Sequence, residues 1–235
     1  MANDKEIAVI LSLKDQLSKE MDKVKQNVSA GAKIMSTALT AMAVAGTAAI
    51  LDLAKSAGEQ ELAEVKLSQA MKQVGKYSDE AFNHLKDYAT ALQTSTTFGD
   101  EAIMSVEEML MRFGAEGPLL DKLTKATLDL AAAKGMDLVA AADLVSKSVG
   151  STTNALTRYG ITVEGDVGST ERLQMAVDNI TKLFGGAAQA QAETYLGRIQ
   201  QISNRFGDLK EKIGMALLPV MNKLLDIGNK VIEWL

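Results

Sequence analysis

Residues 114–137 read Gly-Ala-Glu-Gly-Pro-Leu-Leu-Asp-Lys-Leu-Thr-Lys-Ala-Thr-Leu-Asp-Leu-Ala-Ala-Ala-Lys-Gly-Met-Asp. This stretch carries the signals of a helix together with both of its ends. Pro118 stands where the first helical residue is expected, a position at which its missing N–H has no consequence. Leucines recur at helical spacing after it. Lys134 and Gly135 supply a cation and a glycine cap at the other end, and Asp137 is suited to begin the next helix.

Similar capping and helix-ending residues predict helices along most of the chain. Gly58 is expected to break the first helical pattern, Gly75 to end a helix as a left-handed cap, and Ser169 to cap another. Ser151 is expected to cap a short helix that ends at Tyr159-Gly160. Residues 161–168 are the single β-like stretch, too short for a sheet. The further helices are predicted over 59–75, 79–94, 100–113, 117–134, 137–149 and 170–184.

Composition agrees with an all-α fold. The chain has 235 residues, 4% aromatic residues, two prolines and no cysteine, and it is rich in strong helix formers. β-Sandwiches and barrels need more β-branched and aromatic residues than this. We expect a compact helical hairpin or bundle domain over 59–168. It would be flanked by a coiled-coil helix and an uncharged helix over 1–58, and by a long amphipathic segment over 169–235.

The N-terminal region contains two unusual patterns. Apolar residues over 5–30 form one narrow stripe, typical either of a helix docked on its own domain or of a coiled-coil strand. Residues 34–51 carry no charge. Their small residues recur every fourth position and predict a close-packing ridge, which suits a buried helix in a bundle or a segment that enters a bilayer. The ridge consists of Thr37, Ala41, Ala45 and Ala49.

The C-terminal region, 187–235, has the longest periodicity in the chain. Apolar residues recur every seven positions from Ile199, with companions between them, so the pattern favours a coiled coil over a plain amphipathic helix. We predict a kink near 215–219, because Pro219 interrupts the helical hydrogen bonds. The predicted self-association seam comprises Ile199, Ile202, Phe206, Leu209, Ile213, Val220, Ile227 and Trp234.

No group of residues predicts catalysis, a cofactor or a metal. Cysteine is absent and His84 is the one histidine, so thiolate sites and two-histidine mechanisms are excluded. Glu107 and Glu108 are adjacent and point to different sides of their helix, which does not make an acid–base pair. The net charge of −5 predicts no general affinity for nucleic acid. We therefore expect a protein that is not an enzyme.

Several blocks resemble a known family. The four blocks are Met111–Leu123, Leu128–Val145, Leu156–Ile161 and Arg205–Leu225. The second contains Lys-Gly-Met-Asp and the third contains Arg-Tyr-Gly-Ile. The fourth contains Leu-Lys-Glu-Lys-Ile-Gly and a nearby proline. Together they cover about a quarter of the chain. In this order they resemble the region near the start of tailed-phage tape measure proteins, also called phage-related minor tail proteins.

The resemblance implies a structural virion protein. Members of the family lie in the tail lumen after synthesis in the host cytoplasm, set tail length during assembly, and leave with or ahead of the DNA at ejection. The implied partners are further copies of the chain, the tail tube protein and tail assembly chaperones, with possible contact with the host membrane at infection. Most members are several times longer, so we expect an N-terminal part, a processed product or an unusually short member.

Two other classes of function stay open on the sequence. A helical pore-forming or translocator protein would insert residues 34–51 into a membrane and assemble through its coiled coils. A helical adaptor without membrane contact is the third reading. Spontaneous leakage of liposomes would favour the pore-forming protein, and tail genes beside this one would favour the phage protein.

Overall fold

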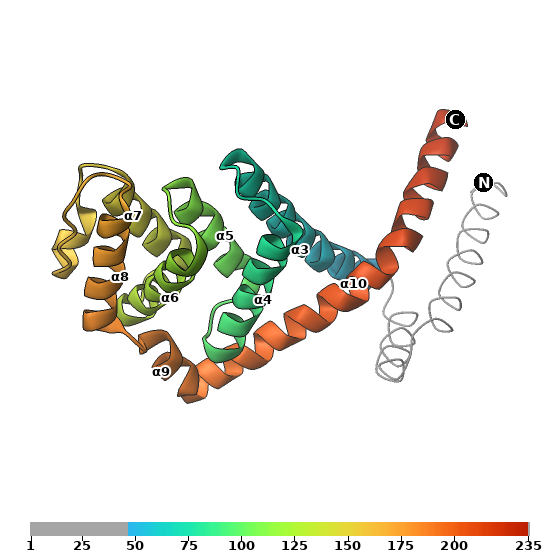
Figure 1. Ribbon diagram of the computed structural model, residues 1–235. Helices are drawn as coiled ribbons and strands as arrows, with labels where there is room; N and C mark the ends of the chain where they lie inside the picture. Colours follow the sequence, from blue (N-terminus) through green and yellow to red (C-terminus); the bar gives the residue numbers. More distant parts are fainter. Residues whose placement is uncertain (1–46, 235) are drawn as a thin grey trace. The chain divides into compact units, whose positions relative to one another are not determined.

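The computed structural model describes residues 47–234. It divides the chain into two compact units: residues 59–206, here called the body, and a second unit from residues 1–58 and 207–235. Of the second unit, residues 47–58 and 207–234 are described. All regular structure in the described part is helical (Figure 1), so the predicted all-α class is confirmed.

The helices follow one another with short connections. Their bounds are α3 Thr47–Gln73, α4 Asp79–Ser95, α5 Asp100–Arg112, α6 Gly117–Lys134, α7 Leu138–Gly150, the 3-10 helix η1 Ala155–Tyr159, α8 Thr170–Phe184, α9 Ala187–Glu193 and α10 Tyr195–Trp234.

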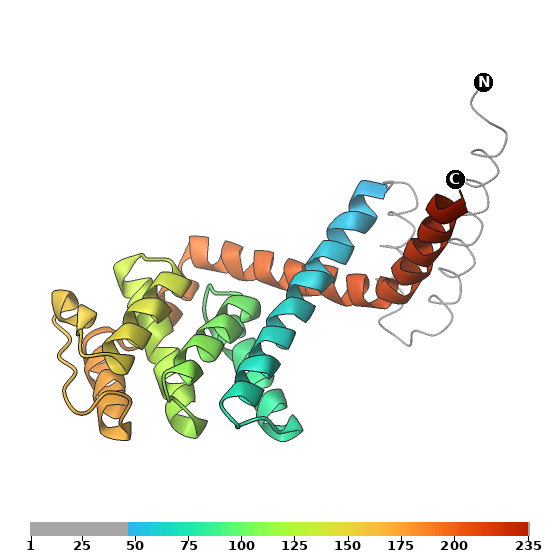
Figure 2. The same cartoon turned by 90° about the horizontal axis from the view of Figure 1, so that it is seen from above.

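Helix α6 lies at the centre of the body. It packs against α4, α5, α7, α8 and α9, and Figure 2 shows α4 to α8 gathered side by side. Leu123, Leu128 and Leu130 of α6 are completely buried or nearly so, together with Ile103 and Leu110 of α5. One continuous hydrophobic core therefore holds the body together.

The predicted helix ends are largely confirmed. Gly135 has φ +59° and ψ +35°, and its N–H bonds the carbonyls of Ala131 and Ala132. This left-handed conformation strains any residue with a Cβ, which is why glycine stands there. Ser78, Asp137 and Ser169 each accept a backbone N–H at the start of a helix. The residues that begin and end these helices could therefore be recognised in the sequence.

Two local predictions were wrong. α3 runs through Gly58 without a break, because a single interior glycine weakens a helix by only about 1 kcal/mol and packing on either side outweighs it. Asn154, not Ser151, precedes η1. Within residues 187–234, Thr194 separates α9 from α10, and its hydroxyl accepts the Gly197 N–H at 3.0 Å.

The predicted boundary at residue 168 has no counterpart in the body. α8, which follows it, packs along α6 and buries Leu173, Ala176 and Ile180 in the common core. The body begins at residue 59 and continues past residue 168 to residue 206. A loop rich in turn residues therefore marks a connection inside the body, not a boundary between domains.

α10 is one continuous helix through Pro219. Its ribbon changes direction in the second half of the helix (Figures 1 and 2), in the manner expected of a proline kink. No described helix is long and apolar enough to cross a membrane.

Candidate functional site

The first half of α10 exposes a row of large apolar side chains, here called the α10 stripe. Its members have exposed fractions between 47% and 79%. Such a row differs from the scattered single apolar residues that are normal on protein surfaces. The α10 stripe comprises Tyr195, Leu196, Ile199, Ile202 and Phe206.

The opposite side of this helix segment is attached to the body by polar groups. The Gln201 side-chain amide donates a hydrogen bond to the Thr94 carbonyl at 3.0 Å, and the Asn204 amide donates to the Thr97 carbonyl at 3.2 Å. At about 100° per residue, Gln201 and Asn204 lie on the side of the helix away from Ile199 and Phe206. The usual amphipathic arrangement is thus inverted, with polar groups inward and apolar groups outward.

Basic residues recur every seven positions beside the α10 stripe. Arg198, Arg205 and Lys212 each come immediately before one of the apolar residues of the seven-residue series, and all three are exposed. Neither arginine has an acidic partner within residues 47–234. Residues 195–206 contain no acid, so the stripe carries a positive edge.

The later part of the predicted seam lies in the second unit. Leu209 is exposed there, but Ile213 is 6% exposed, so Ile213 is buried by its own chain and is not open to a second one. The side chains of Val220, Ile227 and Trp234 lie outside the described residues.

Helix α3 packs against α10 within this second unit. A Cβ added to Gly214 would collide with the Leu53 carbonyl and the Ala57 side chain, so glycine permits the close approach of the two helices. Lys210 Nζ lies 2.7 Å from Asp52 Oδ2. This hydrogen bond and the lysine charge lower the pKa of the Asp52 carboxyl.

The ridge of small residues falls mainly outside the described part of the chain. Thr37, Ala41 and Ala45 precede residue 47, and Ala49 belongs to α3, with its side chain outside the described set. The proposed role of residues 34–51 in a membrane therefore stays a prediction.

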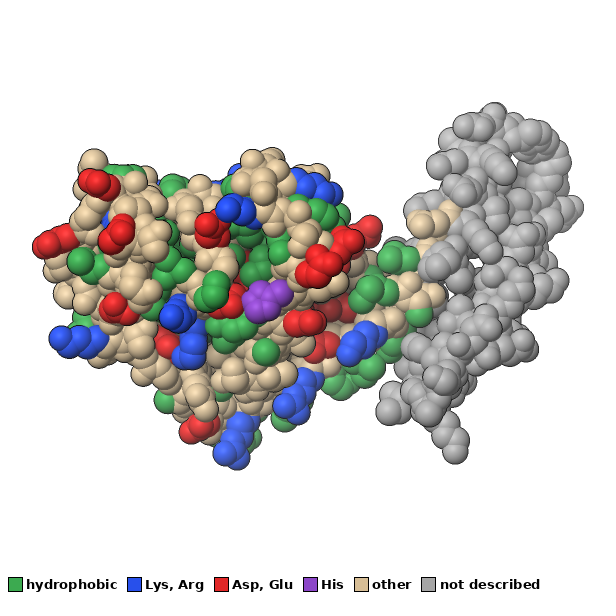
Figure 3. All heavy atoms as spheres, in the orientation of Figure 1, with side chains coloured by type: hydrophobic (Ala, Val, Ile, Leu, Met, Phe, Trp, Pro, Cys, Tyr) green, Lys and Arg blue, Asp and Glu red, His purple; other side chains and the backbone are tan. Residues whose placement is uncertain are grey.

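His84 lies at the surface of the body, as Figure 3 shows in purple. Its Nε2 is 3.0 Å from Asp121 Oδ2, and its ring stacks on Tyr88 with 6.2 Å between centroids. In the described residues, no group of three or more histidine, cysteine or acidic side chains is arranged to hold a metal ion. The histidine therefore has a local packing and pairing role.

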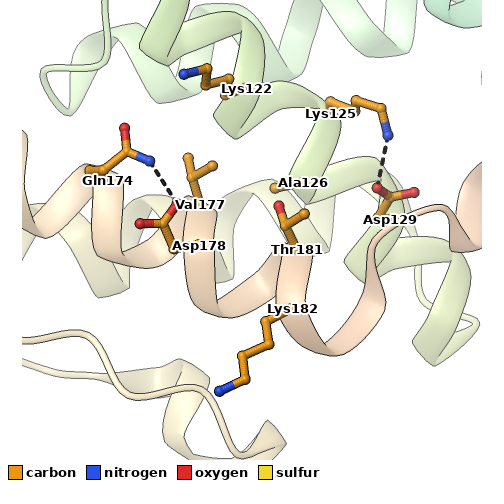
Figure 4. A pocket seen from close by; sticks show the side chains of 9 residues that line it. All are labelled: Lys122, Lys125, Ala126, Asp129, Gln174, Val177, Asp178, Thr181 and Lys182. Carbon is orange, nitrogen blue, oxygen red and sulfur yellow. Dashed lines mark hydrogen bonds and ion pairs between the residues drawn. The ribbon is translucent and has the colours of Figure 1, made fainter.

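A hollow of about 540 Å³ lies between α6 and α8 (Figure 4). Lys125 Nζ pairs with Asp129 at 3.2 Å, and Gln174 donates to Asp178 at 2.7 Å. Figure 4 shows the ammonium groups of Lys122 and Lys182 pointing in different directions. The cations therefore do not converge on one anion, and no nucleophile with an adjacent base is present among these lining side chains.

Glu107 is completely buried in the body, which sequence reasoning missed. Neither of its carboxyl oxygens has a hydrogen-bond partner among the described residues, and burial, with a smaller contribution from Asp121, raises its pKa to about 9. Glu108 instead bonds Arg112 at 2.7 Å. The prediction that the two point to different sides is confirmed. Because the Glu107 carboxyl is closed off from solvent, it has no access to a substrate.

Arg172 is a second buried charged residue that the sequence did not single out. Its guanidinium donates to the Ser148 carbonyl at 3.0 and 2.7 Å, to the Gly165 carbonyl at 2.8 Å and to the Ser151 carbonyl at 2.8 Å. These four bonds fasten the connection between α7 and α8 to the body. The role of Arg172 is structural.

No protein-family model, no curated protein and no solved structure matches this chain. The features that bear on function are therefore the α10 stripe, its basic edge and the sequence blocks described above.

Proposed function

We propose that this chain is a structural protein of a phage or prophage tail, a tape measure protein or part of one, and that the α10 stripe is a contact face with another chain of the tail. The observation that carries the proposal is the inverted amphipathicity of residues 195–206. A helix that turns its polar side to its own body and its apolar side outward is suited to assembly.

Two of the motifs that resemble the family form helix ends and turns in the described residues. Lys134-Gly135-Met136-Asp137 makes the turn from α6 to α7, with Gly135 as the C-cap and Asp137 as the N-cap. Arg158-Tyr159-Gly160-Ile161 ends η1, where Gly160 is left-handed. Both blocks place helices in the body, which supports a scaffold with its contacts on the surface.

The proposal includes several copies of the chain in the tail lumen, with the tail tube protein and tail assembly chaperones as further partners. A second copy is therefore one candidate for the chain that covers the stripe. Sedimentation of the purified protein at tens of micromolar tests self-association directly, and a monomer across that range would remove the homo-oligomer from the proposal.

The tail role itself is tested by deleting the gene from its phage or prophage and examining particles by electron microscopy. The proposal predicts loss of normal tails and restoration by the wild-type gene. Ile202→Asp with Phe206→Asp should fail to restore tails, whereas Val139→Asp, at an exposed apolar residue of α7, should restore them. Normal tails without the gene would refute the proposal.

No described feature favours the pore-forming alternative. Its segment, residues 34–51, lies mostly outside the described residues. Leakage of liposomes by the purified protein remains the experiment that separates it from the scaffold.

A further inference from the structure

We propose that the α10 stripe docks an amphipathic helix of a partner protein, and that this partner helix carries glutamate or aspartate along its edge. The inference rests on the exposed surface of the chain and not on the tail role. It identifies the chemistry of the partner, which the proposed function leaves open.

The shape of the surface suits one helix. The stripe from Tyr195 to Phe206 spans three turns, about 17 Å at 1.5 Å per residue. Ile199, Ile202 and Phe206 follow the three-and-four spacing of a coiled-coil seam. A second helix laid along this row would cover the apolar side chains without disturbing Gln201 and Asn204, which bond the body on the other side.

The charges beside the seam select against a second copy of α10. In an antiparallel pair of identical helices the arginine edges would face each other. In a parallel pair Arg205 would face Lys210 of the other copy, which already has Asp52 as its acidic partner, so neither arrangement brings an acid to Arg205. Like charges in these positions repel and disfavour the pairing. An acidic edge would instead pair with Arg198 and Arg205, neither of which has an acidic partner in the described residues.

The second unit of the chain contains an example of this recognition. There Ile213 belongs to the same seven-residue series and is buried, and the neighbouring Lys210 is paired with Asp52 of α3. A later turn of α10 thus already combines apolar burial with a lysine–aspartate pair across two helices. The proposed partner would repeat this arrangement at the uncovered turns.

An anionic membrane is the other surface with apolar and negative character. The chain is poorly suited to bind such a membrane, because its net charge is −5 and residues 195–206 supply only two cations. Helices that lie on anionic membranes are instead rich in lysine and arginine. Residues 5–30 fit the stripe poorly as an internal partner, since lysines slightly outnumber acids there.

The test uses the full chain and two labelled peptides of about four heptads. Both carry isoleucine and leucine at the seam positions, one with glutamate and the other with lysine at the flanking positions. Fluorescence anisotropy should show binding of the glutamate peptide at least about tenfold tighter than that of the lysine peptide. Added salt should weaken the tighter complex.

Variants assign the binding to the stripe. Arg198→Glu with Arg205→Glu should reverse the preference between the peptides, and Ile202→Asp with Phe206→Asp should abolish binding. Val139→Asp should leave binding unchanged, because Val139 is exposed elsewhere on the body. Circular dichroism of each variant confirms that loss of binding is not loss of folding.

Several results would overturn the proposal. These are equal binding of both peptides, a preference for the lysine peptide, no binding, or binding that survives the Ile202 and Phe206 substitutions. Dimerisation of the chain through the stripe would also overturn it, as would binding to phosphatidylserine vesicles through the stripe in place of the peptide. None of these outcomes decides whether tails form without the gene, so the two proposals fail separately.

Discussion

Helices α6 and the first half of α10 both carry large apolar residues at helical spacing, yet only α6 buries them. Leu123 and Leu130 of α6 are completely buried, whereas Ile202 and Phe206 of α10 are more than 60% exposed. Periodicity therefore reveals that a helix has an apolar face, but it does not reveal what covers that face.

The difference between the two helices lies in their neighbours. α6 is surrounded by α4, α5, α7, α8 and α9, so its apolar side chains pack in all directions. In the first half of α10, Gln201 bonds the Thr94 carbonyl of α4 and Asn204 bonds the Thr97 carbonyl just after that helix. Its apolar residues are not part of the hydrophobic core and are thus available to contact another chain.

The largest effect is expected from shortening a core side chain of α6. Leu123→Ala removes a completely buried side chain and should lower the free energy of unfolding by about 2–5 kcal/mol. Leu183→Ala, at an exposed leucine of α8, should change it by less than about 0.5 kcal/mol. Urea denaturation followed by circular dichroism measures both, and equal losses would contradict the position of the core.

Replacing the buried arginine tests the polar interior of the body. Arg172→Met leaves the Ser148, Ser151 and Gly165 carbonyls without their donor and should lower the free energy of unfolding by about 3 kcal/mol. The connection between α7 and α8 should also become more sensitive to proteolysis. Arg158→Met, at an exposed arginine, serves as the control and should alter neither property.

Replacing the buried glutamate gives an effect of opposite sign. In the fold the pKa of Glu107 is raised from its ordinary 4.5 to about 9. Between these pH values the unfolded chain has released a proton that the folded chain retains, so the stability contributed by this group falls as pH rises. Glu107→Gln lacks this dependence and should be more stable at pH 7, by up to about 3 kcal/mol.

Denaturation at pH 5, 7 and 9 tests this prediction. The advantage of Glu107→Gln over the wild type should grow from pH 5 to pH 9. Glu108→Gln, at the partly exposed neighbour that bonds Arg112, should show no such growth. An advantage independent of pH would mean that the carboxyl ionises normally in the fold.

Features that depend on residues close together in the chain could be predicted from the sequence. The Gly135 and Asp137 caps, the N-cap of Ser169 and the all-α class all follow from local chemistry. The apolar period of residues 199–234 likewise predicted an apolar face that includes Ile199, Ile202 and Phe206, whereas self-association through that face stays a prediction. These predictions needed no knowledge of which helices meet.

Features that depend on distant partners could not be predicted. The burial of Glu107 depends on the helices that pack around α5, and the contacts of Arg172 join α8 to residues 21 and 24 positions earlier. Ile213 is buried in the second unit, where the adjacent Gly214 lies against Leu53 and Ala57 of α3, and the period of the sequence does not reveal this packing. Continuity of the helix through Gly58 was likewise decided by packing and not by the propensity of one residue.

The most direct test of the central claim is the stability of the Ile202→Ser and Phe206→Ser double variant in the full chain. If the α10 stripe is uncovered in the chain itself, the free energy of unfolding should stay within about 0.5 kcal/mol of the wild type. A loss of about 3 kcal/mol or more, comparable with Leu123→Ala, would contradict the account, because it would show that the chain already buries the stripe.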